Sequence, residues 1–481
     1  MTEIAEVCCS SDNGKAGERY DLAILGAGSA GFAAAITAAD AGARVLLIGY
    51  GTIGGTCVNT GCVPSKTLIR AMEALQNART AARFGGVVGE GRIEDWRAVV
   101  EHKDALVASL RRAKYIDLLP RYSTLTYREG WGRLVDGGVA VDGNLIEAGR
   151  VIVATGASPA LPPIPGLDEV PYLTSTTALE LQALPRSLLV LGGGYAGCEL
   201  GQMFARAGTE VTIVDILPLL SAAEPEIARA LERYLREEGV AIRENVHTRS
   251  IRKTAYGIAL GISIEGAAET LAAEQVLVAA GRWPNTAELG LAEGGVELLP
   301  NGGIGVDDYM RTTRPGVYAA GDVTGRDQFV SMAAYGARIA AENALNGDTR
   351  RYDPAAMPSV VFTDPQVASV GLTEAEARAL GHAVKISALP LDQVPRAIAA
   401  RDTRGLIKLV AESESGRLLG AHILAPEGAD SIMAAALAIK CGLTVETLAE
   451  TIFPYLTTVE GLKLAAQSFL KDVTKLSCCA G

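Results

Sequence analysis

The chain has 481 residues, of which 49% are hydrophobic and 21% are charged, the balance of an ordinary globular protein with several domains. Its formal net charge of -11 and pI near 5.1 argue against a general nucleic-acid-binding surface, which would need a basic patch. The 54 glycines cluster after apolar runs, a pattern typical of strand–turn–helix units and not of linkers.

The first residues, 1–17, are polar and lack the charged-then-apolar pattern of a secretion signal. We therefore expect a flexible N-terminal segment on a cytoplasmic protein. The chain has eight cysteines, and none forms a CxxC pair or has a histidine nearby, which argues against a structural zinc site.

Residues 21–49, DLAILGAGSAGFAAAITAADAGARVLLIG, predict a strand, a turn at Gly26, Gly28 and Gly31, a helix of small residues and a second strand. In this GxGxxG arrangement the first glycine makes the turn. The second lets the backbone approach a pyrophosphate, and the third lets helix and strand pack closely. The acid expected about twenty positions on, where it would hold a ribose hydroxyl, is missing because Gly49 stands there.

The same pattern recurs over residues 187–215, SLLVLGGGYAGCELGQMFARAGTEVTIVD, with Gly192, Gly194 and Gly197 at the turn. Here the second strand is followed by an acid, Asp215. An acid at this position favours the free 2′-hydroxyl of NADH, whereas an adjacent arginine would favour the 2′-phosphate of NADPH. Asp215 is followed by ILPLL, without arginine, so the chemistry favours NADH. Two such units predict two dinucleotides, most simply one flavin and one nicotinamide.

Two cysteines follow the first unit in GGTCVNTGCVPSK, where Cys57 and Cys62 lie five residues apart and Lys66 comes soon after. The thiolate is the reactive form of cysteine, and a nearby cation favours it. Structural disulfides are rare in the cytoplasm, so this pair indicates redox chemistry or metal binding. For the isolated Cys198 and Cys441 we expect the role of a small, buried hydrophobic side chain.

With these motifs the chain resembles the flavin-dependent pyridine nucleotide-disulfide oxidoreductases from about Tyr20 to its C-terminus. The resemblance extends to VIVATGASP (151–159), VLVAAGRWPNT (276–286) and GVYAAGDV (316–323). It implies a redox-active pair in which the residue like Cys62 lies against the flavin and the one like Cys57 exchanges with substrate.

The resemblance also implies which residues contact the cofactors. Lys66 would lie near the flavin and pair with Glu199, Asp322 would contact the flavin ribitol, and Tyr195 would cover the nicotinamide pocket. The implied FAD contacts are Gly26, Gly28, Gly31, Gly55, Thr56, Lys66, Thr155, Gly156 and Asp322. The implied NAD(P)H contacts are Gly192, Gly194, Gly197, Glu199, Asp215 and Gly281.

One feature departs from the disulfide reductases of this family, which carry a histidine five residues before a glutamate near the C-terminus to protonate the leaving thiol. Counting back from Glu460 gives Tyr455. A tyrosine with its ordinary pKa of about 10 is a poor proton donor at neutral pH, where histidine is suited to the task. The four histidines of the chain lie elsewhere, at His102, His247, His382 and His422.

The C-terminal residues 459–476 place apolar side chains at three- and four-residue steps and predict an amphipathic helix. Cys478 and Cys479 follow it directly. Adjacent cysteines bridge each other only in a strained ring, so a structural disulfide is disfavoured. Thiolates select soft metal ions, and the pair is suited to capturing one.

Here the resemblance narrows to the mercuric ion reductases, through GGTCVNTGCVPSK, VVFTDPQVA, FPYLTTVEGLKLAAQ and KLSCCAG. It implies that NAD(P)H reduces Hg(II) to Hg(0) through FAD, and that Hg(II) passes from Cys478 and Cys479 to Cys57 and Cys62. Tyrosines like Tyr195 and Tyr455 would surround the metal. Exchange of thiolates on a metal needs no general base, in agreement with the missing histidine.

The resemblance further implies a homodimer in which each tail serves the partner's active site. The acidic charge argues against nucleic acid as a partner, and the glycines of the uncharged stretch 22–39 favour a strand and helix over a membrane span. Many mercuric reductases also carry an N-terminal metal-binding domain with a GMTCxxC motif, which this sequence lacks. Cys8 and Cys9 are either a reduced substitute for it or an incidental pair on a loose terminus, and the sequence leaves both open.

Two other functions compete with this one. A dihydrolipoamide dehydrogenase or another disulfide reductase would agree with Asp215 and with the lack of the metal-binding domain, but not with Tyr455. A flavoprotein that only buffers thiophilic metals would not need the second glycine unit.

The expected fold is α/β, with two Rossmann-like dinucleotide-binding domains and a C-terminal α+β dimerisation domain. The FAD-binding domain would comprise residues 18–161 and 283–351. The NAD(P)H-binding domain would comprise 162–282, and the dimerisation domain with its cysteine tail 352–481.

Overall fold

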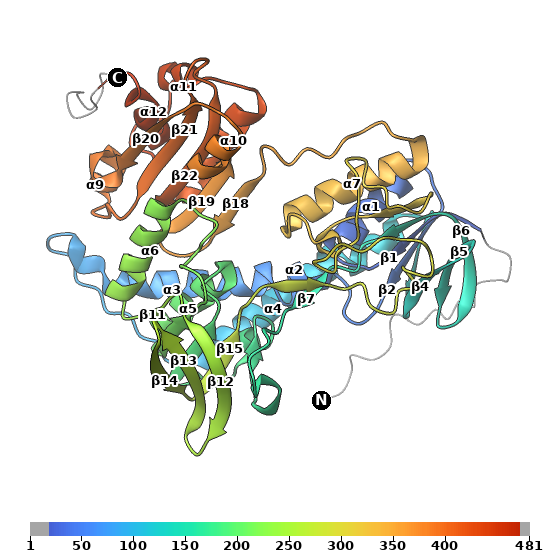
Figure 1. The fold of residues 1–481 in the computed structure, drawn as a ribbon, viewed down its shortest axis with the longest axis horizontal. Coiled ribbons are helices and arrows are strands. Elements are labelled where there is room, and N and C mark those ends of the chain that lie inside the picture. The colour runs from blue at the N-terminus through green and yellow to red at the C-terminus, as the bar shows by residue number, and fades with distance from the viewer. Residues whose placement is uncertain (1–18, 472–481) are drawn as a thin grey trace. The chain divides into compact units, whose positions relative to one another are not determined.

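The structure, a computed structural model, describes residues 19–471, which form two compact units (Figure 1). The first unit comprises residues 19–57, Leu110–Ala157 and Trp283–Tyr352. The second comprises Val58–Ser109, Ser158–Arg282 and residues 353–471. The three domain boundaries drawn from the sequence stay a prediction. The N-terminal segment with Cys8 and Cys9 and the tail with Cys478 and Cys479 lie outside the described residues.

The first unit is built on a sheet whose strand order is β3-β2-β1-β6-β5-β4, with β17 paired to β6. The strands around β1 run parallel, and β4, β5 and β6 form an antiparallel extension. The strands are β1 (Tyr20–Leu25), β2 (Val45–Gly49), β3 (Leu125–Glu129), β4 (Gly132–Val135), β5 (Gly138–Val141), β6 (Asn144–Val153) and β17 (Val317–Ala319).

Two alanine-rich helices, α1 (Ser29–Asp40) and α7 (Val330–Asn346), pack against each other in the first unit (Figure 1). The short helix α2 (Gly55–Asn59) begins in this unit. The strands β1 and β2 are almost wholly buried, as expected for parallel strands. The predicted strand, turn, helix and strand of residues 21–49 are therefore present.

The second unit contains three sheets. The parallel one has the order β11-β10-β9-β15-β8, and the other two, β12-β13-β14 and β18-β19-β22-β21-β20, are antiparallel. The strands are β8 (Leu173–Thr174), β9 (Ser187–Leu191), β10 (Glu210–Val214), β11 (Ala241–Arg243), β12 (His247–Thr254), β13 (Gly257–Ile264), β14 (Ala267–Ala273), β15 (Gln275–Val278), β18 (Pro358–Val361), β19 (Gln366–Gly371), β20 (Val384–Pro390), β21 (Leu406–Glu412) and β22 (Leu418–Ala425). Two short strands, β7 (Ala157–Pro159) and β16 (Arg282–Pro284), lie where the chain passes from one unit to the other.

Helices of the second unit pack on these sheets and on each other. The long α3 packs against α5, and α10 packs against β19 and β22. The helices are α3 (Cys62–Arg79), α5 (Tyr195–Ala207), α6 (Pro225–Glu237), α8 (Glu374–Ala379), α9 (Pro395–Ala399), α10 (Gly428–Lys440), α11 (Val445–Glu450) and α12 (Glu460–Gln467). Helix α4 (Trp96–Lys114) starts in this unit and ends in the first.

The C-terminal helix is shorter than the amphipathic pattern predicts. Helix α12 ends at Gln467, whereas the pattern continues through Phe469 and beyond the described residues. In the last turn of α12, serine hydroxyls bond a carbonyl group that a continuing helix would use. The carbonyl of Ala465 accepts hydrogen bonds from the hydroxyls of Ser387 (2.7 Å) and Ser468 (2.8 Å). The following amides bond three residues back, from Phe469 to Ala466 and from Leu470 to Gln467, so the chain turns.

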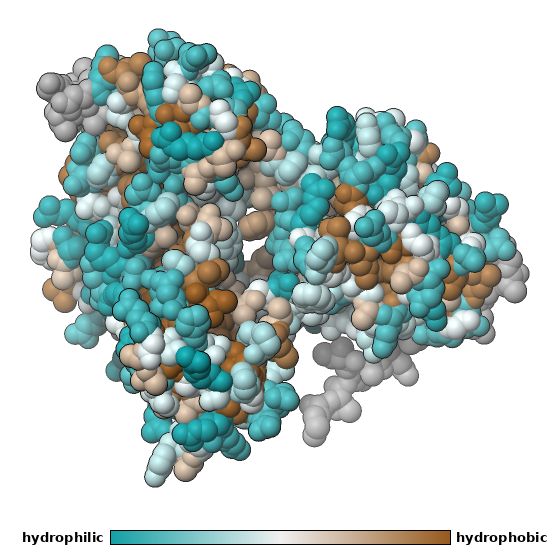
Figure 2. Space-filling view, viewed as in Figure 1, coloured by the Kyte–Doolittle hydropathy of each residue, from teal (hydrophilic) through white to brown (hydrophobic). Residues whose placement is uncertain are grey.

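Over residues 19–471, no helix is both long enough and apolar enough to cross a bilayer. The face shown in Figure 2 is largely hydrophilic, with smaller hydrophobic patches between. In the second unit the exposed apolar side chains include several from α10 and from the loop before α12, namely Met433, Leu437, Ile452, Tyr455 and Leu456.

Candidate active site

The first glycine turn of the chain leaves no room for side chains. Gly26 has φ +114°, and a Cβ there would lie 2.2 Å from the carbonyl oxygen of Ala154. A Cβ on Gly31 would lie 1.8 Å from the carbonyl oxygen of Gly26. Gly28 precedes α1, which has neither a side-chain cap nor an acid in its first turn. The first-turn amides are thus directed at the loop, where they can bind a phosphate.

The second glycine turn repeats this geometry. Gly192 has φ +118°, and a Cβ there would lie 2.4 Å from the carbonyl oxygen of Ala279. A Cβ on Gly197 would lie 1.8 Å from the carbonyl oxygen of Gly192. Helix α5 follows Gly194, again with no side-chain cap and no acid in its first turn. Each unit therefore contains a backbone cradle that fits the pyrophosphate of a dinucleotide.

Other predicted contacts gather around the first turn. A Cβ on Gly55 would lie 2.6 Å from the Cα of Gly28, so the segment that carries Thr56 lies against the turn. Gly321 approaches α1 closely, since its Cβ would lie 3.1 Å from the Cβ of Ala30. This contact brings the half-buried Asp322 near the start of α1.

Thr155 and Gly156 are held by Asn285. The Thr155 hydroxyl donates to the Asn285 carbonyl (2.7 Å), the Asn285 side-chain amide donates to the Thr155 carbonyl (3.0 Å), and the Asn285 backbone amide donates to Gly156 (2.9 Å). In the second unit the corresponding segment ends at Gly281, with φ +97° and open space beside it. The motifs ATG (154–156) and AAG (279–281) thus form the loops that lie beside the two glycine turns.

The two units differ at the end of the second strand. Asp215 accepts hydrogen bonds from the backbone amides of Gly193 (2.5 Å) and Leu217 (2.8 Å), which fixes its carboxylate at the turn. Gly49, at the corresponding place in the first unit, is crowded. A Cβ there would lie 2.8 Å from both the Cβ of Ala27 and the hydroxyl oxygen of Tyr127. The missing acid of the first unit thus has a steric cause that the local sequence does not show.

Cys57 and Cys62 belong to different units. Cys57 lies in α2 at the end of the first part of the first unit, and Cys62 is the first residue of α3 in the second. Both side chains are partly exposed. The positive end of the α3 dipole favours an anionic sulfur at Cys62.

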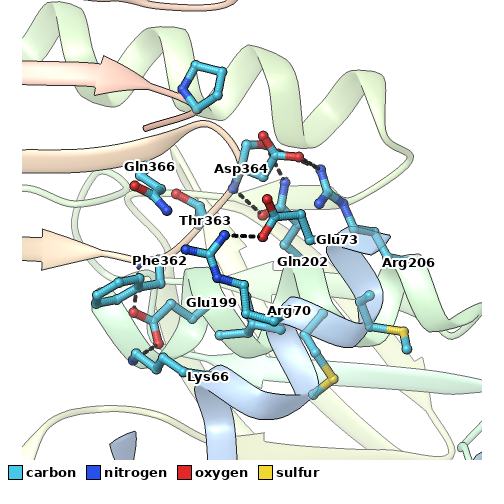
Figure 3. Close-up of a pocket in the computed structure, with 14 residues that line it drawn as sticks. Lys66, Arg70, Glu73, Glu199, Gln202, Arg206, Phe362, Thr363, Asp364 and Gln366 are labelled. Atoms are coloured by element: carbon cyan, nitrogen blue, oxygen red, sulfur yellow. Dashed lines mark hydrogen bonds and ion pairs between the residues drawn. The ribbon is translucent and has the colours of Figure 1, made fainter. Parts of the chain in front are cut away.

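The ion pair implied between Lys66 and Glu199 is present, with 2.6 Å between Lys66 Nζ and Glu199 Oε2 (Figure 3). The other oxygen of Glu199 accepts the backbone amide of Phe362 at 2.9 Å. The ammonium also lies 4.8 Å from the centre of the Phe362 ring. Glu199 is buried and Lys66 is partly exposed, so the carboxylate fixes a cation one turn along α3 from Cys62.

A polar network beside this pair was not predicted. Asp364 pairs with Arg206 (2.9 Å) and exchanges two hydrogen bonds with the side chain of Gln202 (2.8 and 2.9 Å; Figure 3). Arg206 also pairs with Glu238 at 2.6 Å. Burial acts to lower the pKa of Arg206, but the bond to Glu238 and the charge of Asp364 outweigh it and raise the pKa. The network anchors α5 to the loop before β19.

The two predicted metal-site tyrosines are both accessible. Tyr195 begins α5 and is 38% exposed, and Tyr455 is 49% exposed in the loop before α12. The carboxylate of Glu460, which would orient a histidine at 455, accepts the backbone amide of Leu456 at 3.2 Å. All four histidines lie within residues 19–471, and none lines the pocket beside Lys66.

The prediction for the isolated cysteines is confirmed for one and wrong for the other. Cys198 is fully buried, its thiol donates to the carbonyl of Gly193 (3.3 Å), and burial, with Glu199 and Asp215, raises its pKa far above the usual range. Cys441 is exposed, because it caps the C-terminus of α10 where the helix leaves the protein core. Among the described residues, no three histidine, cysteine or acidic side chains gather as a metal site.

Comparisons with known proteins agree with this arrangement. Residues 20–340 match the family model for pyridine nucleotide-disulphide oxidoreductases, and residues 357–466 match the dimerisation domain of the same family. The chain is 47% identical to the mercuric reductase of Streptomyces lividans over 96% of this chain and 98% of that protein. It is 46% identical to the mercuric reductase of Lysinibacillus sphaericus, over 96% of this chain and 85% of that protein.

Solved structures of similar fold include the Cu(II) complex of the flavoprotein disulfide reductase RclA from Escherichia coli. The TM-score is 0.83 at 32% identity, covering 95% of this chain and 100% of that one. LpdA from Mycobacterium tuberculosis has a TM-score of 0.82 at 30% identity, with the same coverage.

Proposed function

Because the chain belongs to the mercuric reductases of the pyridine nucleotide-disulphide oxidoreductase family, we propose that it reduces Hg(II) to Hg(0) with electrons from NAD(P)H. The family, the fold class and the enzyme class predicted from the sequence are confirmed by these relatives. The roles of individual residues, given below, are part of the proposal.

The cofactors of this family are FAD and NAD(P)H, and the two glycine turns fit them. The first turn would hold FAD, with Gly55, Thr155, Gly156 and Asp322 around it. The second would hold the nicotinamide dinucleotide, with Asp215 on its ribose and Gly281 beside it. When bound there, the two cofactors would supply hydride transfer from NAD(P)H to the flavin and the two electrons that convert Hg(II) to Hg(0).

The cysteines handle the metal. In our proposal Cys478 and Cys479 take Hg(II) from a solution thiol complex and pass it to Cys57 and Cys62, each transfer replacing one Hg–S bond by another. Once the metal is reduced and leaves as Hg(0), both inner sulfurs remain as thiolates. Lys66, fixed by Glu199 one turn from Cys62, favours that anionic form.

The observation that carries the proposal is Tyr455 at the position where disulfide reductases have a histidine. A leaving thiol must be protonated, and general acid catalysis at neutral pH suits an imidazole. Ligand exchange on Hg(II) needs no such acid. The carboxylate of Glu460 accepts the backbone amide of Leu456 and so stabilises the loop that carries Tyr455.

For the coenzyme we propose NADH over NADPH. Asp215 lies at the turn with its carboxylate fixed by two amides, as recognition of a free 2′-hydroxyl requires. The cation on the neighbouring strand, Arg243, is paired with Glu269 at 3.2 Å. A 2′-phosphate would therefore meet a carboxylate without a compensating guanidinium.

The dimerisation domain supports a homodimer. We further propose that each tail serves the partner's site, and that the enzyme works in the cytoplasm, where thiols stay reduced. Exposed apolar side chains on α10 and before α12, such as Met433, Leu437 and Ile452, are suited to a subunit interface. The role of Cys8 and Cys9 stays open between a metal-binding pair and an incidental one.

The test is oxidation of NADH and NADPH by the FAD-loaded protein in excess thiol, with and without Hg(II), together with trapping of mercury vapour. We expect Hg(II)-dependent oxidation and one Hg(0) per NADH. The Cys57→Ala variant should lose this turnover, and a Cys478→Ala, Cys479→Ala variant should be slowed when Hg(II) is thiol-bound. The exposed Cys441→Ala serves as the control and should be unaffected.

Reduction of lipoamide or another disulfide, with Hg(II) acting only as an inhibitor, would contradict the proposal. The function would then be that of a disulfide reductase, and Tyr455 would have to be restudied as a base. Metal binding without any NADH oxidation would identify a buffer of thiophilic metals instead.

A further inference from the structure

The space beside Gly49, where the sequence pattern leads us to expect an acid, is occupied by the side chain of Tyr127. The hydroxyl oxygen of Tyr127 lies 2.8 Å from the position of a Cβ on Gly49, and its Cε2 lies 3.0 Å away. A separation of that size is close to the distance between Cβ and a carboxylate oxygen in a glutamate. The phenol oxygen is therefore where the oxygen of an acid at residue 49 could lie.

The register of the sheet explains how Tyr127 reaches this place. In the parallel pairing of β2 and β3, Tyr127 is opposite Leu47, and Glu129 is opposite Gly49. Side chains two residues apart on a strand share a face, so Tyr127 is a diagonal neighbour of Gly49. Because Gly49 has no side chain, the ring can lean along the strand toward the carboxyl end of the sheet.

That end of the sheet is where dinucleotides bind in such folds. The same Gly49 site lies 2.8 Å from the Cβ of Ala27, which belongs to the glycine turn itself. The ends of β2 and β3 are fixed to each other, since the amide of Gly130 donates to the carbonyl of Gly49 at 2.8 Å. Tyr50 and Trp131 add a ring contact just beyond, with centroids 5.0 Å apart.

We propose that the hydroxyl of Tyr127 replaces the usual acid and hydrogen-bonds the adenosine ribose of FAD. A phenol can donate and accept, so it can pair with a ribose hydroxyl as a carboxylate does. The exchange of residues is coupled, because an acid at 49 would collide with the tyrosine ring. The inference rests on flavin binding by the first unit and is independent of the mercury chemistry.

The experiment measures the Kd of the apoprotein for FAD by flavin fluorescence, without NADH or Hg(II). We expect Tyr127→Phe, which removes only the hydroxyl, to weaken binding about 3- to 10-fold, the effect of one neutral hydrogen bond. Tyr122→Phe, which removes a hydroxyl from the same unit but not from the contact with Gly49, is the matched control and should bind FAD normally.

A second pair of measurements tests whether Tyr127 hydrogen-bonds the ribose or only fills the space beside Gly49. The analogue to use is FAD without its adenosine ribose hydroxyls. For the wild type, the Kd of this analogue should be higher than the Kd of FAD. For Tyr127→Phe, the two Kd values should be equal, because the hydrogen bond is already lost. Gly49→Glu alone should weaken FAD binding by collision, and Gly49→Glu with Tyr127→Val should restore it.

Equal Kd values for FAD in the wild type and Tyr127→Phe would overturn the proposal and leave Tyr127 as a filler of the space beside Gly49. So would an equal loss for the analogue in both proteins. A fall in the thermal midpoint of the Tyr127→Phe apoprotein without discrimination of the analogue would also count against it. None of these results depends on whether the enzyme reduces mercury.

Discussion

The two units begin with the same glycine turn but are stabilised differently around it. Among residues 19–471, the buried lysine, arginine, histidine and acidic side chains all belong to the second unit: Lys103, Glu199, Arg206, Glu224, Lys408, His422 and Glu460. Tyrosines aside, the buried polar side chains of the first unit are uncharged, Thr324 and Asn343. The contrast extends to the end of the strand that follows each first helix, with Gly49 at the end of β2 in one unit and Asp215 after β10 in the other.

The comparison distinguishes the glycine turn, which both units share, from the charged residues around it, in which they differ. The backbone turn with its close carbonyl contacts is common to both units, and in each it leaves no room for a side chain at the first and third glycines. The group on the ribose and the charge of the surrounding core do vary. Buried ion pairs stabilise only while both partners are present, so the second unit should respond more strongly to loss of one charge and to acid.

The largest effect is expected from Lys408→Met in the second unit. Lys408 Nζ lies 2.9 Å from the buried Glu224 and 3.0 Å from Glu374, and its loss leaves a buried carboxylate unpaired. We expect the free energy of unfolding to fall by about 3–5 kcal/mol, measured by urea denaturation. The control is Lys385→Met, exposed on neighbouring β20. If Lys408→Met and Lys385→Met had similar free energies of unfolding, the idea that buried ion pairs stabilise the second unit would be wrong.

The next test breaks the shared turn in each unit. Gly31→Ala and Gly197→Ala each place a methyl group 1.8 Å from a carbonyl oxygen, at a cost of about 1–3 kcal/mol or more. Gly31→Ala should be purified with less FAD per chain. Gly197→Ala should keep its flavin while its KM for NADH rises about tenfold or more. Gly85→Ala, in open space, is the control. Loss of flavin in both variants would contradict separate roles for the turns.

A smaller effect is expected at the ribose position of the second unit. Asp215→Asn removes the charge and leaves one acceptor oxygen, so it keeps the hydrogen bond to only one of the amides of Gly193 and Leu217, which bond different carboxylate oxygens in the wild type. The KM for NADH should rise about 3- to 10-fold, as for a weakened charged hydrogen bond, and the KM for NADPH should fall toward it. Steady-state kinetics with both coenzymes checks this. A change in kcat alone would place Asp215 outside coenzyme recognition.

The smallest effect concerns acid. Burial lowers the pKa of His422, which faces Glu224, Lys408 and Glu376, so the folded protein keeps it neutral while the unfolded chain takes up a proton near pH 6.5. The contribution of His422 to stability is thus fully present above that pH and is lost as the pH drops below it. The test measures the free energy of unfolding of His422→Gln and of the wild type between pH 7.5 and 5.5 and compares how steeply each falls with pH. An unchanged slope would show that His422 titrates normally.

Much of the site could be predicted because its residues follow local rules. The spacing of both glycine turns is local, with Gly31 against Gly26 and Gly197 against Gly192, so the sequence shows the pattern, although not the distant carbonyls that also crowd the turns. The pair Lys66–Glu199 was predicted only through family resemblance, since nothing in the local sequence links two helices. The loop positions of Thr155 and Gly281 likewise followed from short motifs.

Other features could not be predicted because their causes lie far away along the chain. The absence of an acid at Gly49 is explained by Tyr127 on the next strand. Helix α12 ends early because Ser387, from β20, bonds one of its last carbonyls. A lone lysine in an apolar strand, such as Lys408, has no local signal for its partners, which are Glu226 on α6 and Glu374 on α8.

The contrast between Cys198 and Cys441 affects any count of bound metal. Cys198 is sealed against the Gly193 carbonyl, so it will not compete for a thiophilic ion in the folded protein. Cys441 is exposed, and an accessible thiol of this kind can bind Hg(II) away from the proposed site. A titration of the folded enzyme with mercury should therefore be compared with one of the Cys441→Ala protein, and the difference between the two is the metal bound at Cys441.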